Sequence, residues 1–181
     1  MNLKFTPTNL PGVWLIEPRV FKDARGFFLE DYRKDIFAQH GVKDVFVQDN
    51  HSFSKKGALR GLHFQAKPKA QAKLVRVVRG EVFDVVVDIR RKSKTYGQYT
   101  AHILTAENKK MLFMPAGFAH GYLTLSKEAE FLYKVSQFYS PAHERALLWN
   151  DPQVGVKWPK LNVPVMLSEK DKKASSLKDL Q

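Results

Sequence analysis

Leu59-Arg60-Gly61-Leu62-His63-Phe64-Gln65 is a short run in which a cation and an imidazole lie three residues apart among apolar neighbours. In a β-strand the side chains alternate between two faces, so His63 and Gln65 share one face and Arg60 lies on the other. A histidine beside an amide is compatible with a functional surface, and equally with a histidine whose hydrogen bonds are satisfied in the core. The run predicts a strand and leaves the role of His63 open.

Alternation with the same period of two recurs along much of the chain, between turns rich in Gly, Pro, Asn or Lys. It predicts short strands at residues 13–16, 46–48, 73–79, 82–89, 98–104, 111–114, 121–125 and 130–138. Helical spacing occurs at residues 30–40, and Ser168 with Asp171 resembles a capping box that opens a short C-terminal helix. Many short strands with little helix between them favour an all-β sandwich or barrel over a parallel α/β sheet.

The composition fits one globular domain. Of 181 residues, 44% are hydrophobic and 12% aromatic, which is enough to bury a core. The chain has no cysteine, which excludes a disulfide scaffold, a thiolate metal site and a cysteine nucleophile. Neither G-x-G-x-x-G nor G-x-x-x-x-G-K occurs, so a Rossmann or P-loop nucleotide site is not expected. No stretch resembles a signal peptide or a membrane helix, and we expect a soluble, cytoplasmic protein.

The formal net charge of +12 points to an anionic partner, such as nucleic acid, an acidic membrane or a phosphorylated small molecule. The lysines, however, are scattered in pairs at 55–56, 109–110 and 172–173. Because no single helix or arm gathers them, most are expected on the solvated surface. We therefore expect neither nucleic acid nor a membrane as a partner.

Two polar residues are predicted to point inward from strands. Tyr133 shares a face with apolar neighbours, where a phenol requires a hydrogen-bond partner or a functional reason. Lys73 falls on the face of Val75 and Val77, and a buried lysine is costly without an anionic neighbour. Asp84 or Asp88, which share one face of the following strand, would provide that neighbour.

Three further segments are open to a functional or a plain structural interpretation. His120 follows the turn at residues 115–117 and begins a strand or lies in a surface loop. Residues 25–30 combine a cation, two aromatic rings and a carboxylate, which suits a base and its phosphates or simply a turn. Residues 48–52 offer amides that read a heterocycle edge, or form a polar loop. No metal site is expected, since residues 63–65 have glutamine where a His-x-His pair would place its second ligand.

Together these segments resemble the RmlC family, the dTDP-4-dehydrorhamnose 3,5-epimerases of nucleotide-sugar biosynthesis. The resemblance runs in order from about residue 10 to residue 172. The matching segments are 17–21, 23–30, 46–52, 59–65, 73–77, 80–85, 115–121, 139–141, 149–152 and 167–171.

The resemblance implies an all-β, cupin-type jelly-roll barrel or sandwich with one or two short peripheral helices. It implies a single domain over residues 1–181, with an N-terminal arm to about residue 50, a core over about 51–140 and a C-terminal segment over about 141–181. It also implies a homodimer that converts dTDP-4-dehydro-6-deoxy-D-glucose to dTDP-4-dehydro-L-rhamnose without a metal or another cofactor.

Residue roles follow from the same resemblance. His63 would be the general base, Asp171 the carboxylate that orients it, Tyr133 the acid on the opposite face, and Lys73 the cation near the keto oxygen. Asp171 keeps its alternative explanation as a helix cap. The implied substrate contacts are Arg25, Glu30, Gln48, Asp49, Asn50, Arg60, Lys73, His120, Glu144 and Lys170.

Other functions remain open at this level. An epimerase that inverts only C3 or only C5 of a related nucleotide sugar would share the base, the acid and the lysine. A metal-dependent cupin enzyme and a non-catalytic module that binds carbohydrate or nucleic acid are more distant alternatives.

Overall fold

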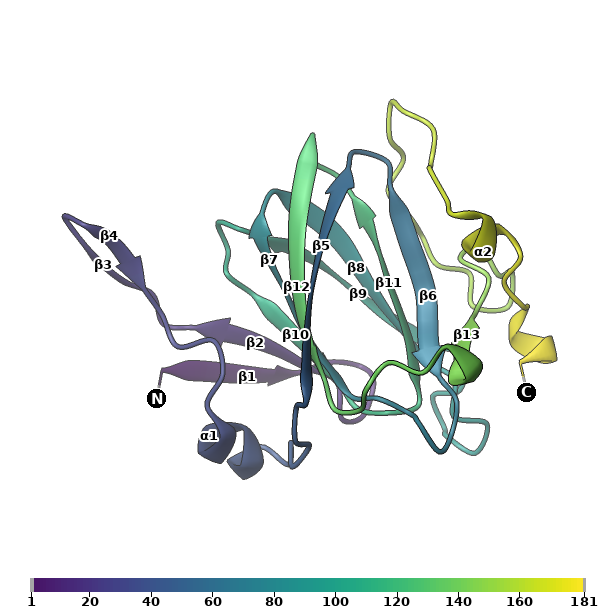
Figure 1. Ribbon diagram of the computed structural model, residues 1–181, viewed down its shortest axis with the longest axis horizontal. Coiled ribbons are helices and arrows are strands. Elements are labelled where there is room, and N and C mark those ends of the chain that lie inside the picture. The colour runs from purple at the N-terminus through teal and green to yellow at the C-terminus, as the bar shows by residue number, and fades with distance from the viewer. Residues whose placement is uncertain (1, 181) are drawn as a thin grey trace.

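Two antiparallel β-sheets make up most of the protein in a computed structural model, which describes residues 2–180 (Figure 1). The six-stranded sheet has the order β1 (Leu3–Pro7), β2 (Trp14–Pro18), β10 (Met111–Met114), β7 (Lys73–Arg79), β12 (Glu128–Val135), β5 (Gln48–Lys55). The five-stranded sheet has the order β13 (Glu144–Ala146), β6 (Leu59–Gln65), β11 (Phe118–Thr124), β8 (Glu81–Asp88), β9 (Tyr99–Thr105). Sequence neighbours mostly lie in opposite sheets, which is the jelly-roll arrangement, so the all-β prediction is confirmed.

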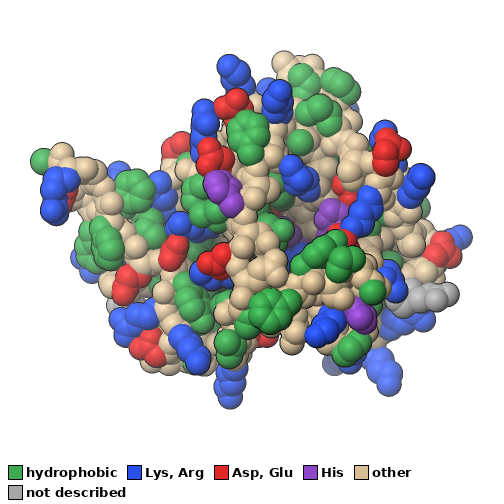
Figure 2. Space-filling view, viewed as in Figure 1, with side chains coloured by type: hydrophobic (Ala, Val, Ile, Leu, Met, Phe, Trp, Pro, Cys, Tyr) green, Lys and Arg blue, Asp and Glu red, His purple; other side chains and the backbone are tan. Residues whose placement is uncertain are grey.

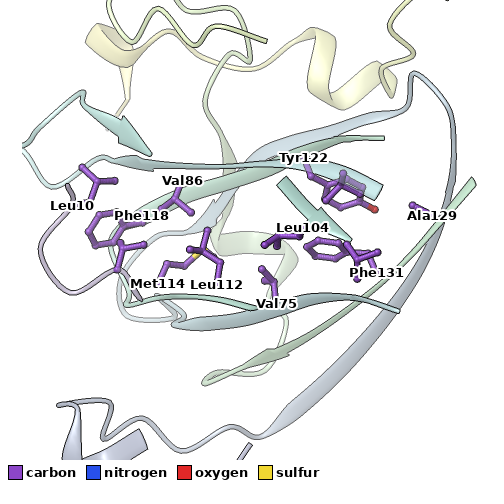
Figure 3. Close-up of a cluster of buried hydrophobic side chains, with 13 residues drawn as sticks. Leu10, Val75, Val86, Leu104, Leu112, Met114, Phe118, Tyr122, Ala129 and Phe131 are labelled. Atoms are coloured by element: carbon purple, nitrogen blue, oxygen red, sulfur yellow. The ribbon is translucent and has the colours of Figure 1, made fainter. Parts of the chain in front are cut away.

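The main core lies between the two sheets (Figure 3). Val75 and Phe131 face it from the six-stranded sheet, and Val86 and Tyr122 face it from the five-stranded sheet. The outer face of each sheet is covered separately. The helix α1 (Lys34–Gln39) packs Phe37 on one side, and the C-terminal segment packs Leu177 on the other. The space between the sheets is therefore fixed from both sides.

The N-terminal region also forms a hairpin, β3 (Phe21–Asp23) and β4 (Gly26–Phe28), which projects away from the body of the protein (Figure 1). Phe27 and Phe28 are 58% and 65% exposed on it. The C-terminal helix α2 (Glu169–Lys172) lies at the other side, next to β6. No helix within residues 2–180 is long and apolar enough to cross a membrane.

The predicted strands at 73–79 and 111–114 have the bounds of β7 and β10, but two other predictions were wrong. The helix predicted over residues 30–40 is only α1, because Arg33 has an extended backbone. The segment 48–52, interpreted as a polar loop, is the first part of β5. Its alternate side chains are polar because they face a cleft, so hydrophobic alternation does not reveal the strand. The strands β1, β3, β4 and β13 were not predicted.

Candidate active site

A cleft of about 770 Å³ opens between the two sheets. Its walls come from β5, β7 and β12 on one side and from β6 and β11 on the other, with residues 166–168 and Asp171 at the rim. Figure 2 shows histidine and Lys or Arg side chains in a hollow on this face, while other basic side chains are spread over the visible surface. The cleft is thus lined by polar groups from both sheets.

A β-bulge in β6 brings Arg60 and His63 to the same side of the strand. His63 pairs with His120 and Arg60 pairs with Tyr122, so three residues of β6 span two of β11. Gly61 lies in this bulge with a φ of 127°, and a Cβ there would be 2.5 Å from the Gly121 Cα. Strict alternation placed Arg60 and His63 on opposite faces, and that prediction was wrong because the extra residue reverses the alternation.

His63 forms a close pair with Asp171. Its Nε2 lies 2.5 Å from Asp171 Oδ1, and Ser168 Oγ donates to Asp171 Oδ2 at 2.8 Å. Burial acts to raise the pKa of Asp171, but the hydrogen bond and charge of His63, with the Ser168 hydrogen bond and the Lys170 charge, together lower it. A carboxylate on Nε2 favours the tautomer with the proton there, which leaves the lone pair on Nδ1. Ser168 also caps α2, so Asp171 serves the helix and the histidine at once.

Lys73 is buried, as its position in β7 predicted, with 7% of its surface exposed. Its Nζ donates to the carbonyl oxygen of His63 at 3.1 Å and so links the two sheets across the cleft. Burial lowers the pKa of Lys73 to about 8, although the Asp84 and Glu144 carboxylates act in the opposite direction. Asp84 is thus the anionic neighbour that one of the two candidate aspartates was expected to supply. The lysine remains mostly charged at neutral pH.

Tyr133 faces the cleft from β12, in the sheet opposite His63. Its hydroxyl makes no hydrogen bond to any residue that the structure describes. Burial, and then the neighbouring Tyr122 phenol, raise the pKa of Tyr133, so the hydroxyl keeps its proton near neutral pH. Tyr133 thus presents to the cleft a protonated hydroxyl that is available to hydrogen-bond a ligand.

His120 is buried and is the third residue of β11, so the alternative that it lies in a surface loop was wrong. Its Nε2 lies 2.9 Å from Asp84 Oδ2 and 3.1 Å from Asp84 Oδ1, and Asp84 is fully buried. His120 lines the cleft, as Lys73 does, and Asp84 lies behind it.

The remaining predicted contacts divide into two groups. Gln48, Asn50, Arg60 and Glu144 line the cleft. Four others do not. Asp49 points from the outer face of β5 and pairs with Lys134 at 3.0 Å, because neighbouring strand residues alternate.

Lys170 lies outside the cleft lining but forms an ion pair with Glu144. Burial acts to raise the pKa of Glu144, yet the hydrogen bonds from Lys170 and Tyr139 and the charges of Lys170 and His63 together lower it. Arg25 lies on the projecting hairpin and pairs with Asp23 at 2.6 Å, and Glu30 accepts from Asn2 at 2.5 Å. The structure therefore does not bring these two residues to the cleft of their own chain.

Several cleft residues escaped the sequence analysis. Ser52, Ser54 and Tyr122 form a hydroxyl cluster at the wall, and Tyr139 donates to Glu144 at 2.6 Å. The two serines carried no distinguishing signal, because β5 is polar on both faces except at Phe53. Within residues 2–180, no group of three or more His, Cys, Asp or Glu side chains is placed to hold a metal ion.

These features define a cupin-type jelly-roll protein with a cleft between its sheets that is lined by histidine, lysine, tyrosine and carboxylate side chains. The family model for dTDP-4-dehydrorhamnose 3,5-epimerase matches residues 7–179. The dTDP-4-dehydrorhamnose 3,5-epimerase of Pseudomonas aeruginosa is 52% identical over 98% of this chain and 97% of its own. The chain therefore belongs to the dTDP-4-dehydrorhamnose 3,5-epimerase family, and it is an epimerase.

Two solved structures show the same fold with ligands. The RmlC epimerase of Legionella pneumophila in complex with dTDP-4-keto-L-rhamnose has a TM-score of 0.95 and 44% identity, and the alignment covers 99% of this chain and 95% of that one. ChmJ of Streptomyces bikiniensis, a 3'-monoepimerase in complex with dTDP-quinovose, has a TM-score of 0.89 and 34% identity, with 95% and 87% coverage.

Proposed function

We propose that the cleft converts dTDP-4-dehydro-6-deoxy-D-glucose to dTDP-4-dehydro-L-rhamnose by inverting C3 and C5, a step of dTDP-L-rhamnose biosynthesis. The observation that carries the proposal is the placement of His63 and Tyr133 on opposite sheets of one cleft. A flat sugar ring held between the sheets would meet the base on one face and the acid on the other. The ligand of the Legionella relative, dTDP-4-keto-L-rhamnose, is the product of this reaction.

The chemistry needs a base and a cation close together. The hydrogens on C3 and C5 are both α to the C4 ketone, so removal of either proton produces an enolate with its charge on the C4 oxygen. The Nζ of Lys73, next to His63 and mostly protonated at neutral pH, supports a role in stabilising that charge. We propose no metal and no redox cofactor, because the ketone of the substrate already acidifies both hydrogens.

His63 accepts the proton in this proposal. Donation of its Nε2 proton to Asp171 leaves Nδ1 as the base, and the carboxylate stabilises the imidazolium that forms. Tyr133 then delivers a proton to the opposite face of the carbon, which inverts it. The raised pKa of Tyr133 supports this role, since the phenol is protonated and ready to donate.

We propose that Gln48, Asn50, Arg60, His120 and Glu144 contact the substrate from the cleft wall. Asp49 and Lys170 would act from just outside the cleft. Asp49 lies between the lining residues Gln48 and Asn50 in sequence, and Lys170 forms an ion pair with the lining residue Glu144.

We further propose a homodimer in which the β3–β4 hairpin of one protomer reaches the cleft of its partner. Arg25 and Glu30 lie away from the cleft of their own chain, and Phe27 and Phe28 are exposed on the projecting hairpin. A partner would cover the aromatic rings and give both polar residues a substrate to contact. Sedimentation equilibrium at micromolar protein tests the assembly, and a monomer there would contradict it. A single cupin-like domain and a cytoplasmic location also stay predictions.

A second candidate is inversion of one carbon only, which the likeness to the 3'-monoepimerase ChmJ favours. The same base, acid and lysine would serve it. Family membership argues against the metal-dependent cupin and the binding module.

Proton NMR in deuterium oxide, without added metal, separates the two candidates. The purified protein is incubated with dTDP-4-dehydro-6-deoxy-D-glucose, and a reductase then traps the product. Deuterium at both C3 and C5 with an L-rhamnose product supports the double epimerase. Deuterium at one carbon supports the second candidate, and no exchange at all contradicts both.

Two variants test the residue roles in the same experiment. His63→Ala should abolish exchange at both carbons because the base is lost. Tyr133→Phe should retain exchange but lose inversion, since deuterium returns from the side that lost the proton. Turnover at the wild-type rate in His63→Ala would refute the proposed mechanism.

A further inference from the structure

Arg60 is held in the cleft wall by neutral groups. Its Nε donates to Ser54 Oγ at 2.9 Å, and its Nη2 donates to the carbonyl oxygen of Phe53 at 3.0 Å. No carboxylate forms an ion pair with Arg60 anywhere in residues 2–180. The guanidinium is therefore oriented without being neutralised, and three of its five N–H donors remain for a ligand.

The serine that holds Arg60 belongs to a chain of hydroxyl groups. Ser54 Oγ lies 3.1 Å from the Tyr122 hydroxyl, which lies 3.0 Å from Ser52 Oγ. Ser52 Oγ in turn lies 3.5 Å from the carbonyl oxygen of Phe131, to which it can only donate.

Ser54 Oγ accepts from Arg60 Nε, which leaves the Ser54 hydroxyl proton available to the Tyr122 hydroxyl. Either hydroxyl of the Tyr122–Ser52 contact can be the donor. Linked hydrogen bonds of this kind strengthen one another.

The chain is anchored to the core. Ser54 and Tyr122 are 3% and 4% exposed, and the Tyr122 ring stacks on Phe131 with centroids 4.3 Å apart. The bulge at Gly61 sets Arg60 opposite Tyr122 on the cleft side of the sheet. Buried groups on three strands thus determine where the guanidinium points.

We propose that Tyr122 and Ser54 are positioning residues that orient Arg60 toward the diphosphate of the substrate. This inference rests on the proposed function, in which Arg60 contacts the substrate. Neutral partners suit the task, because a carboxylate would compete with the phosphate oxygens for the guanidinium. Fixed donors also reduce the entropy lost when the diphosphate binds.

Binding measurements on Tyr122→Phe and Ser54→Ala test the proposal. Tyr122→Phe keeps the stacked ring and removes only the hydroxyl. Calorimetry with dTDP should show affinity weakened about fivefold in each variant, which corresponds to about 1 kcal/mol, the typical net contribution of one hydrogen bond. Affinity for the neutral nucleoside thymidine should not change. With the sugar substrate, KM should rise while kcat stays within about twofold of wild type.

A double-mutant cycle separates positioning from folding. In an Arg60→Met background, Tyr122→Phe should not weaken dTDP binding further, because the group it orients is absent. The matched control is Tyr96→Phe, which removes a hydroxyl that donates to the Leu177 carbonyl oxygen at 3.2 Å outside the cleft. It should leave both affinities unchanged.

Binding to Arg60→Met distinguishes the substrate role of Arg60 from the positioning role of Tyr122 and Ser54. Unchanged dTDP affinity in Arg60→Met would refute the substrate role of Arg60 and the positioning role with it. Weaker binding in Arg60→Met, but not in Tyr122→Phe or Ser54→Ala, would overturn the positioning role alone. The positioning role would also be overturned if Tyr122→Phe or Ser54→Ala weakened the binding of thymidine as much as that of dTDP. It would be overturned as well if Tyr122→Phe weakened dTDP binding as strongly in the Arg60→Met background as it does in the wild-type protein.

Discussion

Lys73→Met should make the protein more stable while it destroys activity. Lys73 is 7% exposed, and burial lowers its pKa from 10.5 to about 8. Because the charged lysine is less stable in the folded protein than in the unfolded chain, its burial lowers the unfolding free energy by about 3 kcal/mol at pH 7. The variant also loses the 3.1 Å hydrogen bond to the His63 carbonyl oxygen, worth about 1 kcal/mol. The net expectation is a gain of about 2 kcal/mol at pH 7, since methionine fills a similar volume.

The gain should shrink as the pH rises. The folded protein releases the Lys73 proton near pH 8 and the unfolded chain near pH 10.5, so the folded state binds fewer protons between these values. The cost of burying the charge is complete below the folded pKa and disappears above the unfolded one. The stability of the wild-type protein should therefore approach, and by about pH 10 reach, that of Lys73→Met.

Urea unfolding at several pH values measures this difference, together with kcat on the same samples. Lys4→Met is the matched control, because its side chain is 75% exposed and its stability should change by less than about 0.5 kcal/mol. A Lys73→Met protein no more stable than wild type at pH 7 would refute the reasoning. A gain that stays constant up to pH 10 would show that it does not come from the lysine charge.

Two further substitutions test the histidine pair and the bulge. Asp171→Asn should lower kcat by about 100-fold or more, because a neutral amide does not stabilise the imidazolium. Ser168→Ala, which removes the helix cap, should cost about 1 kcal/mol of unfolding free energy but retain most activity. Equal loss of kcat in both would favour a purely structural Asp171. Gly61→Ala should destabilise by more than about 2 kcal/mol in urea unfolding, because its φ of 127° is strained for alanine and its Cβ would meet the Gly121 backbone at 2.5 Å. Gly26→Ala is the matched control, because Gly26 has a φ of 133° and no atom lies within 4 Å of an added Cβ. It should have only the backbone strain and lose less unfolding free energy than Gly61→Ala. Equal losses in the two variants would contradict the predicted clash with the Gly121 backbone.

The local pattern of side chains was enough to predict the all-β class and several strands. The bounds of β7 and β10 agree because their apolar residues alternate between two buried faces. The same alternation placed Lys73 inward. For β5 it failed, since polar residues that line a cleft carry no hydrophobic signal. The resemblance to a family then supplied the residue roles that spacing alone left open.

The composition of the candidate site depended on contacts between distant parts of the chain. The pairing of β6 with β11 contains the bulge that turns Arg60 and His63 to the same side. Asp171 reaches His63 across 108 residues of sequence, and Ser54 reaches Tyr122 across 68. Period two is a property of neighbouring residues, whereas strand register and the choice of facing sheet arise from pairing over long separations. The sequence alone therefore determined the all-β class and the inward side chains of regular strands such as β7, and the tertiary structure decided which side chains of β5 and β6 face the cleft and which residues meet there.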